Sequence, residues 1–372
     1  MLIAALATLP VPLSRAAEEA PAAPASSASS SRHGIDLAFD SQFSSDIAVM
    51  ETTGLYRLDH PRTDLALSVG YSTVALDYQP AAFDLISEPR HRTEERPSAQ
   101  LNLRHEWPSR LTWIAGAGAY EGFTDYRSAW LDEYYRQYFV GQPGYQDADP
   151  RGYSLSGGVR WEYWRSAGFA QVEGSFNRDE VSPGYEINLD TGLRRGTDRL
   201  YTTAARVTFE NIVSRRVRVL NEFQLAKTTE REPRYAYQGS ANVALGEHWV
   251  WRGVLGLAKE QPQLESLSVG AVLEREWGQR WFLSAVLRFY RDTGQLTNLG
   301  LLSSATPPVT TWQAGVGLRW QGERLAVKLV AGPYFTRYDA PGRQSALDVA
   351  PFENLYRDRD WFFAQAAVSL SL

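Results

Sequence analysis

The 372-residue sequence has no cysteine, only two methionines and no surplus of positive charge. The absence of cysteine is compatible with export but does not establish the compartment by itself. A net charge of −5 gives no indication of a nucleic-acid partner, which would favour a basic patch. Past the first residues no apolar run approaches the roughly 18 residues of a membrane-spanning helix, which excludes a helical inner-membrane protein. Membrane-spanning β-strands alternate between polar and apolar residues, so their mean hydropathy is polar and this composition does not exclude them.

Catalytic motifs are also missing. The five histidines are scattered, and the sequence has no G-x-S-x-G, H-E-x-x-H or glycine-rich phosphate-binding motif. We therefore expect no enzymatic activity, no cofactor and no metal site. The single D-x-D pair, Asp147 and Asp149, is a weak indication of Ca²⁺ and is more typical of a solvated loop. An active site built from residues distant in sequence is the alternative.

The first 33 residues differ from the rest of the chain. An apolar core at 2–13 and the small residues around Arg15 predict a signal peptide over residues 1–16. No Lys or Arg precedes this core, which favours a start codon further upstream over a poor signal. Residues 17–33 are rich in Ala, Pro and Ser and predict a disordered linker before a folded unit at 34–372.

From Gly34 onward, polar and apolar residues alternate with a period of two, which predicts β-strands. The pattern is clear at 153–163 and 311–320, where the polar face is rich in Gly and Ser and suits a lumen wall as well as a solvated sheet. Sixteen strands are predicted: 34–43, 46–59, 63–79, 98–107, 111–124, 152–164, 168–179, 199–213, 216–229, 233–245, 248–259, 262–277, 280–293, 309–320, 324–338 and 360–372. Without the first hairpin, whose tip is Ser44-Ser45, fourteen strands would be left.

The connections between these strands differ in length. Very short turns lie at 60–62, 108–110, 165–167, 214–215, 246–247, 278–279 and 321–323, and long polar links lie at 80–97, 125–151, 180–198, 294–308 and 339–359. The two kinds fall at opposite ends of the strands. This arrangement resembles that of porin-like bacterial outer-membrane β-barrels, which have short periplasmic turns and long extracellular loops. The resemblance covers 34–372, identifies no subfamily, and implies an all-β, antiparallel, up-and-down transmembrane barrel.

Tryptophan gathers at the short-turn end of the predicted strands, as expected for an aromatic belt at a membrane–water interface. The residues are Trp107, Trp113, Trp161, Trp164, Trp249, Trp251, Trp277, Trp281 and Trp320. A looser belt at the long-loop end is predicted from Tyr71, Tyr78, Tyr120, Tyr290, Tyr334 and Tyr338.

The last twelve residues, 361–372, alternate like the C-terminal strand that barrel assembly machinery recognises, although such strands usually end in Phe or Trp and this one ends in Leu372. The resemblance therefore implies the outer membrane of a Gram-negative bacterium. The implied partners are the assembly machinery and outer-membrane lipid, including lipopolysaccharide. It implies no nucleic acid and leaves a homo-oligomer open.

Charged residues recur on the face that would line the lumen. An arginine facing lipid at mid-membrane would cost roughly 2–4 kcal/mol, which favours placement in the lumen. One interpretation is an ion-pair lattice that braces the strands, and the other is a ring of charges that selects solutes. The residues are Arg104, Glu106, Arg160, Glu162, Arg206, Arg252, Arg288, Arg319 and Lys328, with Glu210, Arg218, Glu222, Glu274 and Glu276 beside them.

The segment WLDEYYRQYF at 130–139 breaks the period of two, because its aromatic residues recur every four positions, as on one face of a helix. It lies in the third and longest of the long-loop-side connections. General porins with sixteen strands fold this loop into the barrel, so the resemblance implies a constriction at 125–151 with Asp132, Glu133 and Arg136 near the channel. A surface loop packed by its own aromatic residues is the alternative.

Sixteen strands leave an aqueous channel, whereas eight are filled by side chains. The predicted function is passive diffusion of small hydrophilic solutes across the outer membrane. A closed barrel for surface structure or ligand binding is the main alternative, and a barrel-embedded hydrolase is a further one.

Overall fold

The computed structural model describes residues 31–78, 90–123, 136, 140–147, 150–180, 185–188, 192–195, 199–229, 231–260, 264–294, 307–339 and 357–372. The expected signal peptide and most of the expected linker lie outside these residues. In the described part of the chain, no helix is long and apolar enough to cross a membrane.

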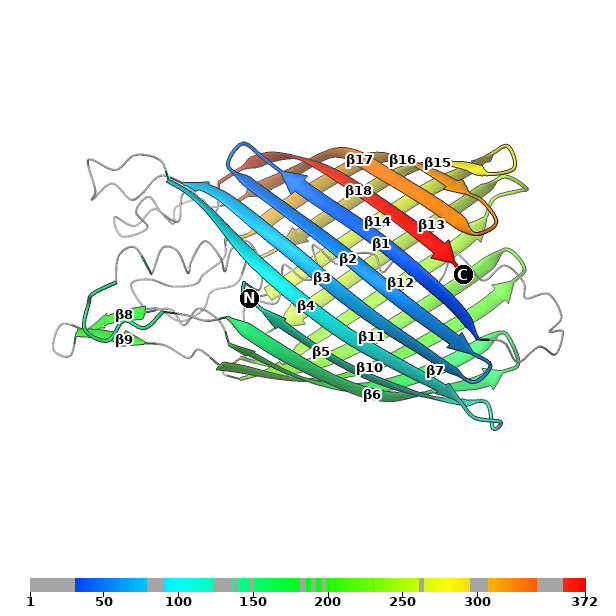
Figure 1. The fold of residues 1–372 in the computed structure, drawn as a ribbon, viewed down its shortest axis with the longest axis horizontal. Coiled ribbons are helices and arrows are strands. Elements are labelled where there is room, and N and C mark those ends of the chain that lie inside the picture. Colours follow the sequence, from blue (N-terminus) through cyan, green and yellow to red (C-terminus); the bar gives the residue numbers. More distant parts are fainter. Residues whose placement is uncertain are drawn as a thin grey trace.

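Sixteen antiparallel strands form one closed barrel, which confirms the predicted fold and strand number (Figure 1). The barrel strands are β1 (Arg32–Phe43), β2 (Ile47–His60), β3 (Thr63–Tyr78), β4 (Arg90–Glu106), β5 (Leu111–Glu121), β6 (Arg151–Trp164), β7 (Gly168–Glu180), β10 (Arg199–Ser214), β11 (Val217–Thr228), β12 (Arg234–Ala244), β13 (Trp249–Glu260), β14 (Leu264–Trp277), β15 (Trp281–Asp292), β16 (Val309–Gln321), β17 (Leu325–Tyr338) and β18 (Arg359–Ser371). A separate hairpin, β8 (Tyr185–Asn188) with β9 (Gly192–Arg195), lies between β7 and β10. It extends beyond the barrel at the end opposite the C-terminus.

The first hairpin is present, so the fourteen-strand alternative is wrong. β1 pairs with β2 on one side and with β18 on the other, from Gly34 opposite Ser371 to Phe43 opposite Phe362. Both ends of the described chain therefore lie at the short-turn end, where the Leu372 amide donates to the carbonyl oxygen of His33.

One strand begins eight residues earlier than predicted. β4 starts at Arg90 instead of residue 98, and its added residues pair with the upper part of β3, for example Arg92 with Leu76 and Glu94 with Val74. These residues are mostly charged, so the alternation of apolar residues gave no signal for them. Backbone hydrogen bonds are sufficient to extend a strand pair where no apolar band has to be covered.

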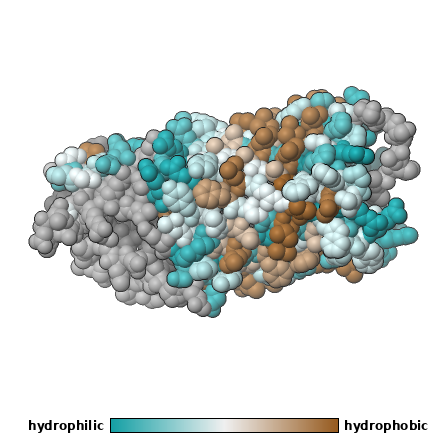
Figure 2. Space-filling model, turned by 90° about the horizontal axis from the view of Figure 1, so that it is seen from below, coloured by the Kyte–Doolittle hydropathy of each residue, from teal (hydrophilic) through white to brown (hydrophobic). Residues whose placement is uncertain are grey.

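The outer face of the barrel is apolar and exposed. Leu67, Val69, Leu155, Val172 and Val316 have exposed fractions of 41–73%. In Figure 2 a hydrophobic band crosses the wall between two hydrophilic zones. Exposed apolar surface of this extent marks contact with lipid or protein. Strands of 11–17 residues tilted by about 40° rise roughly 28–43 Å, more than the apolar band of about 25 Å.

The predicted tryptophans lie on this outer face. Eight of the nine are exposed and Trp320 is partly exposed, so their contact with a membrane interface stays a prediction. The predicted tyrosine belt is wrong at four positions, because Tyr120, Tyr290, Tyr334 and Tyr338 belong to the lumen-facing set of their strands. Tyr71 is outward and exposed, whereas the Tyr78 side chain lies outside the described part. Other exposed aromatic side chains near the long-loop end are Phe43, Tyr153, Tyr201, Tyr235, Trp312 and Phe362.

Candidate functional site in the barrel lumen

The inward face of the barrel is polar, and it carries the charged residues predicted for the lumen. Because side chains alternate along a strand, the register places one set of each strand toward the interior. The exposed apolar residues mark the outward set of each strand, so the alternate residues form the inward set. The predicted residues of this set are Arg104, Glu106, Arg160, Glu162, Arg206, Arg252, Arg288, Arg319 and Lys328.

The wall from β6 to β11 holds a balanced ion-pair network. Glu210 accepts from Arg160 at 3.2 Å and from Arg218 at 2.5 Å. Arg206 contacts Glu173 at 2.6 Å and Glu222 at 3.8 Å. Three arginines therefore face three carboxylates. The pairs join β7 to β10 and β10 to β11, and Arg160 of β6 reaches Glu210 of β10 across β7, as the lattice interpretation expects.

The wall from β13 to β17 is less balanced. One oxygen of Glu274 accepts from Arg252 at 3.1 Å and from Arg319 at 2.9 Å. Lys328 is the direct cross-strand partner of Arg319, and like charges in that position repel. Within the described part of the chain, Lys328 forms no hydrogen bond or ion pair, and the opposite charge that acts on it is Glu274.

Arg288 extends this basic wall toward the middle of the barrel. Its guanidinium donates to Gln313 at 3.3 Å, and the acid whose charge acts on it is Asp40 of β1. Asp40 in turn accepts from Gln365 at 2.5 Å. The carboxylates that contact these four cations or act on them are Glu274 and Asp40, while Glu276 is engaged by His248 at 3.4 Å nearer the turn. Two further inward carboxylates of this wall, Glu260 and Asp292, lie at its long-loop end and act on Arg234 of β12.

The remaining predicted lumen residues lie close to the short turns. Arg104 contacts Glu106 at 3.4 Å on the same strand. Glu162 accepts from the backbone amide of Ser166 in the β6–β7 turn. These contacts are local and do not connect to the two networks described above.

Besides Asp40, further lumen carboxylates were not predicted from the sequence, and two of them form ion pairs with lumen arginines. Glu173 is buried and paired with Arg206, and alternation along β7 places it inward. Asp36 pairs with Arg57 at 2.8 Å between β1 and β2. The alternation along β1 places Asp36 on the polar face of that strand. This face is part of the lumen wall only if the hairpin of β1 and β2 belongs to the barrel.

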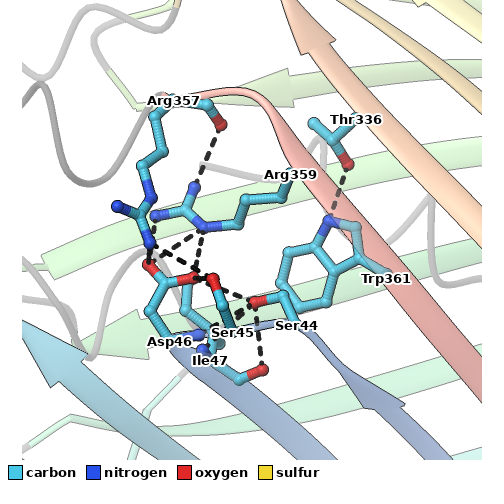
Figure 3. Close-up of polar contacts among 8 residues, drawn as sticks. All are labelled: Ser44, Ser45, Asp46, Ile47, Thr336, Arg357, Arg359 and Trp361. Carbon is cyan, nitrogen blue, oxygen red and sulfur yellow. Dashed lines mark hydrogen bonds and ion pairs between the residues drawn. The ribbon is translucent and has the colours of Figure 1, made fainter.

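At the long-loop end, a buried clasp joins the β1–β2 turn to the start of β18 (Figure 3). Asp46 accepts from Nε of Arg359 at 3.1 and 3.2 Å, from its Nη2 at 2.9 Å, and from Arg357 at 2.8 Å. Asp46 and Arg359 are 8% and 3% exposed. The clasp therefore closes the seam where the first and last strands meet.

The charge of Asp46 is favoured by these contacts. Burial by itself would raise the pKa of this carboxyl group, but the hydrogen bonds and charges of Arg359 and Arg357, with a hydrogen bond from Ser44, outweigh burial and lower the pKa below its ordinary value. Asp46 is thus ionised in the folded barrel.

The predicted constriction falls mostly outside the described residues, including Asp132 and Glu133. Arg136 is described as helical, and the amide of Val140 donates to its carbonyl oxygen at 3.3 Å, the spacing of a helical turn. The entry of this loop into the barrel stays a prediction.

Among the described residues, no group of three or more His, Cys, Asp or Glu is arranged to hold a metal ion. Of the D-x-D pair, Asp147 accepts from the hydroxyl of Tyr145 at 2.7 Å, and Asp149 lies outside the described part.

No family model and no curated protein matches the chain. Among solved structures, it is similar to CdiB from Acinetobacter baumannii, with a TM-score of 0.53, 10% identity and coverage of 91% of this chain and 60% of that one. It is similar to a bacterial polysaccharide outer membrane secretin, with a TM-score of 0.50, 7% identity and coverage of 91% and 98%. OprB from Pseudomonas putida has a TM-score of 0.47, 10% identity and coverage of 92% of both chains.

At these identities the likeness shows the fold alone, and the chain spans 60% of the length of CdiB. The closed sixteen-strand barrel, its apolar outer wall and these similarities together give the chain the fold of an outer-membrane β-barrel. No narrower family is assigned.

Proposed function

We propose that this protein is a channel for passive diffusion of small hydrophilic solutes. The observation that carries the proposal is the closed barrel of sixteen strands whose inward face is lined by charged side chains. A barrel of this size encloses more space than its inward side chains fill. The charges lie on the wall, so a hydrated solute keeps polar contacts along its path.

The proposed channel lies in the outer membrane of a Gram-negative bacterium, with its long-loop end outward. The exposed tryptophans near the short turns, such as Trp113 and Trp277, would lie at the periplasmic interface. In this proposal the lumen needs no cofactor and carries out no chemical step.

A liposome-swelling assay tests the proposal. Vesicles that contain the purified protein are moved into isosmotic solutions of small sugars, amino acids or salts. The expected result is rapid swelling that slows as the solute becomes larger. Swelling no faster than in protein-free vesicles, with insertion verified, would favour a closed barrel.

The loop at 125–151 is proposed to narrow this channel. Deleting residues 128–140 removes its aromatic turn, so the conductance of single channels should rise because the narrowest section widens. Unchanged conductance would indicate that this loop lies at the surface and does not narrow the channel. The deletion leaves β5 and β6 intact, because these strands end at Glu121 and begin at Arg151.

A further inference from the structure

Three arginines gather on the outer face of the barrel at its long-loop end. Arg151 of β6, Arg178 of β7 and Arg199 of β10 lie 2.7, 2.7 and 3.5 Å from the carboxylate of Glu180. Glu180 is the direct register partner of both Arg151 and Arg199, so these side chains share the outward face. Within the described part of the chain, the ion pairs of all three arginines share the carboxylate of Glu180.

The neighbouring strands add one carboxylate and one cation to this area. Glu121 of β5 lies opposite Arg151, and Lys227 of β11 lies opposite Thr203 of β10. Among the residues that the structure describes, the outward-facing upper ends of β5, β6, β7, β10 and β11 thus carry four cations and two carboxylates. These are Arg151, Arg178, Arg199 and Lys227, against Glu121 and Glu180.

An aromatic shelf lies directly below the arginines. Tyr153, Phe176 and Tyr201 belong to the same three strands, and successive ring centroids are 6.2 Å apart. Tyr153 and Tyr201 are each 42% exposed. The guanidinium of Arg178 lies 5.9 Å from the ring of Tyr153, so charge and apolar surface meet at this level.

The height of the shelf matches one boundary of a membrane. Tyr153 and Trp161 lie on the same face of β6, eight residues apart. That separation is roughly 26 Å along the strand and about 20 Å across the membrane for a tilt of about 40°. With Trp161 at the short-turn interface, Tyr153 lies near the opposite interface, and Arg151 lies at the level of the lipid headgroups.

A groove opens on the same outer wall beside the shelf. It has a volume of about 920 Å³ and runs from Ala205 and Val207 on β10, four residues or more below Tyr201, to the long-loop end of β13–β15, where Lys259, Glu265 and Arg291 line it. Its lower walls include Phe223 and Leu257, which are 50% and 47% exposed. This lower part of the groove provides an apolar concave surface at the depth of acyl chains.

We propose that this face binds a phosphorylated lipid of the leaflet at the long-loop end. Its phosphate is held by Arg151, Arg178 and Arg199, because guanidinium groups pair with phosphate oxygens through two parallel hydrogen bonds. Its acyl chains lie on the aromatic shelf and in the groove. Lipopolysaccharide supplies this chemistry in an outer membrane. The inference rests on the proposed membrane location and not on channel activity. A result that contradicts the lipid site therefore leaves the proposed channel function untouched, and the reverse also holds.

Native mass spectrometry of the detergent-purified barrel tests this site. The protein is mixed with a phosphorylated lipid A, with its dephosphorylated form, or with phosphatidylcholine. The wild-type barrel should retain the phosphorylated lipid preferentially. The double variant R151Q/R199Q should bind it about tenfold more weakly, as expected when charge-assisted hydrogen bonds are lost. Equal retention of the dephosphorylated form would overturn the proposal even if the double variant does not fold.

Two further variants separate lipid binding from strand bracing. Glu180→Gln removes the compensating negative charge, so it should tighten binding severalfold, whereas a purely structural cluster would leave binding unchanged. Arg337→Gln is the matched control, because Arg337 also faces outward at this end but is paired with Asp358 at 3.9 Å and Asp360 at 2.5 Å. An equal loss in Arg337→Gln and R151Q/R199Q would overturn the site.

Discussion

The side chain of Asp46 connects residues at opposite ends of the sequence. Its partner Arg359 is 313 positions away and is almost completely buried. A buried ion pair is satisfied only while both members are present, because removal of one leaves an uncompensated charge. The clasp therefore ties the closure of the barrel to a single carboxylate.

Asp46→Ala should lower the free energy of unfolding by about 3–5 kcal/mol, since the Arg359 guanidinium would stay buried without its partner. The measurement is urea unfolding of the barrel refolded in lipid vesicles. Asp360→Ala is the control, because Asp360 follows Arg359 directly but is 72% exposed. Its loss should cost no more than about 1 kcal/mol. Equal costs would contradict the buried clasp.

The contribution of Asp46 should also depend on pH. Because folding lowers the pKa of this carboxyl group, its stabilising contribution is present above the ordinary value of 3.8 and is lost as pH falls below it. The difference in unfolding free energy between the wild type and Asp46→Asn should therefore shrink in that acidic range. A difference that grows on acidification would show that the pKa is raised instead.

Among the described lumen residues, Lys328 is a cation without an ion pair and with Arg319 as its cross-strand partner, so its removal should change ion selectivity. Lys328→Gln should lower the anion-to-cation permeability ratio by about twofold or more, because the wall potential that attracts anions falls. Reversal potentials in a salt gradient measure the ratio. Lys259→Gln is the control, since Lys259 faces outward and pairs with Glu265 at 2.6 Å. The same shift in both variants would exclude a specific effect of the lumen wall.

At the scale of the strands, Gly332 and Pro333 of β17 occupy positions where substitution would disturb the packing of β17 against β16. The pairing of β17 with β16 is interrupted between Gln313 and Val316, opposite Gly332 and Pro333. Proline has no backbone N–H to donate, and the backbones approach closely at Gly332. A Cβ atom there would lie 2.0 Å from the carbonyl oxygen of Ala314.

Gly332→Ala should therefore destabilise the barrel by roughly 1–3 kcal/mol, the usual cost of overpacking. Gly174→Ala in β7 is the matched control, because nothing lies within 4 Å of its added Cβ atom. Its effect should stay within about 1 kcal/mol. Urea midpoints of the two variants give the comparison, and identical midpoints would show that β16 and β17 can separate at no cost.

The strands could be read from the sequence because alternation is a local property. β15 and β16 differ from their predicted bounds by one residue at most at either end. The prediction of a tyrosine belt was wrong because it used only the distance of Tyr120 and Tyr334 from a turn. It did not use the strand face, which Tyr120 shares with Gly118 and Tyr334 shares with Gly332. Parity along the strand would have placed both side chains in the lumen.

At the scale of the whole molecule, closure of the barrel determines which side chains pair across strands, and these pairings could not be predicted from the sequence. The lumen charges Arg160 and Glu210 were both found, but their pairing across β7 follows from the stagger of three strands. The clasp depends in the same way on the register between β1 and β18. Local patterns determine which face a residue occupies, whereas only the closed register determines which charges meet.

The central claim is that the barrel encloses an open aqueous path. Recording current across a planar lipid bilayer after adding the purified protein tests it most directly. We expect discrete conductance steps of uniform size, each from one inserted barrel. A bilayer that stays electrically tight, although the protein is shown to be inserted and folded, would contradict the account.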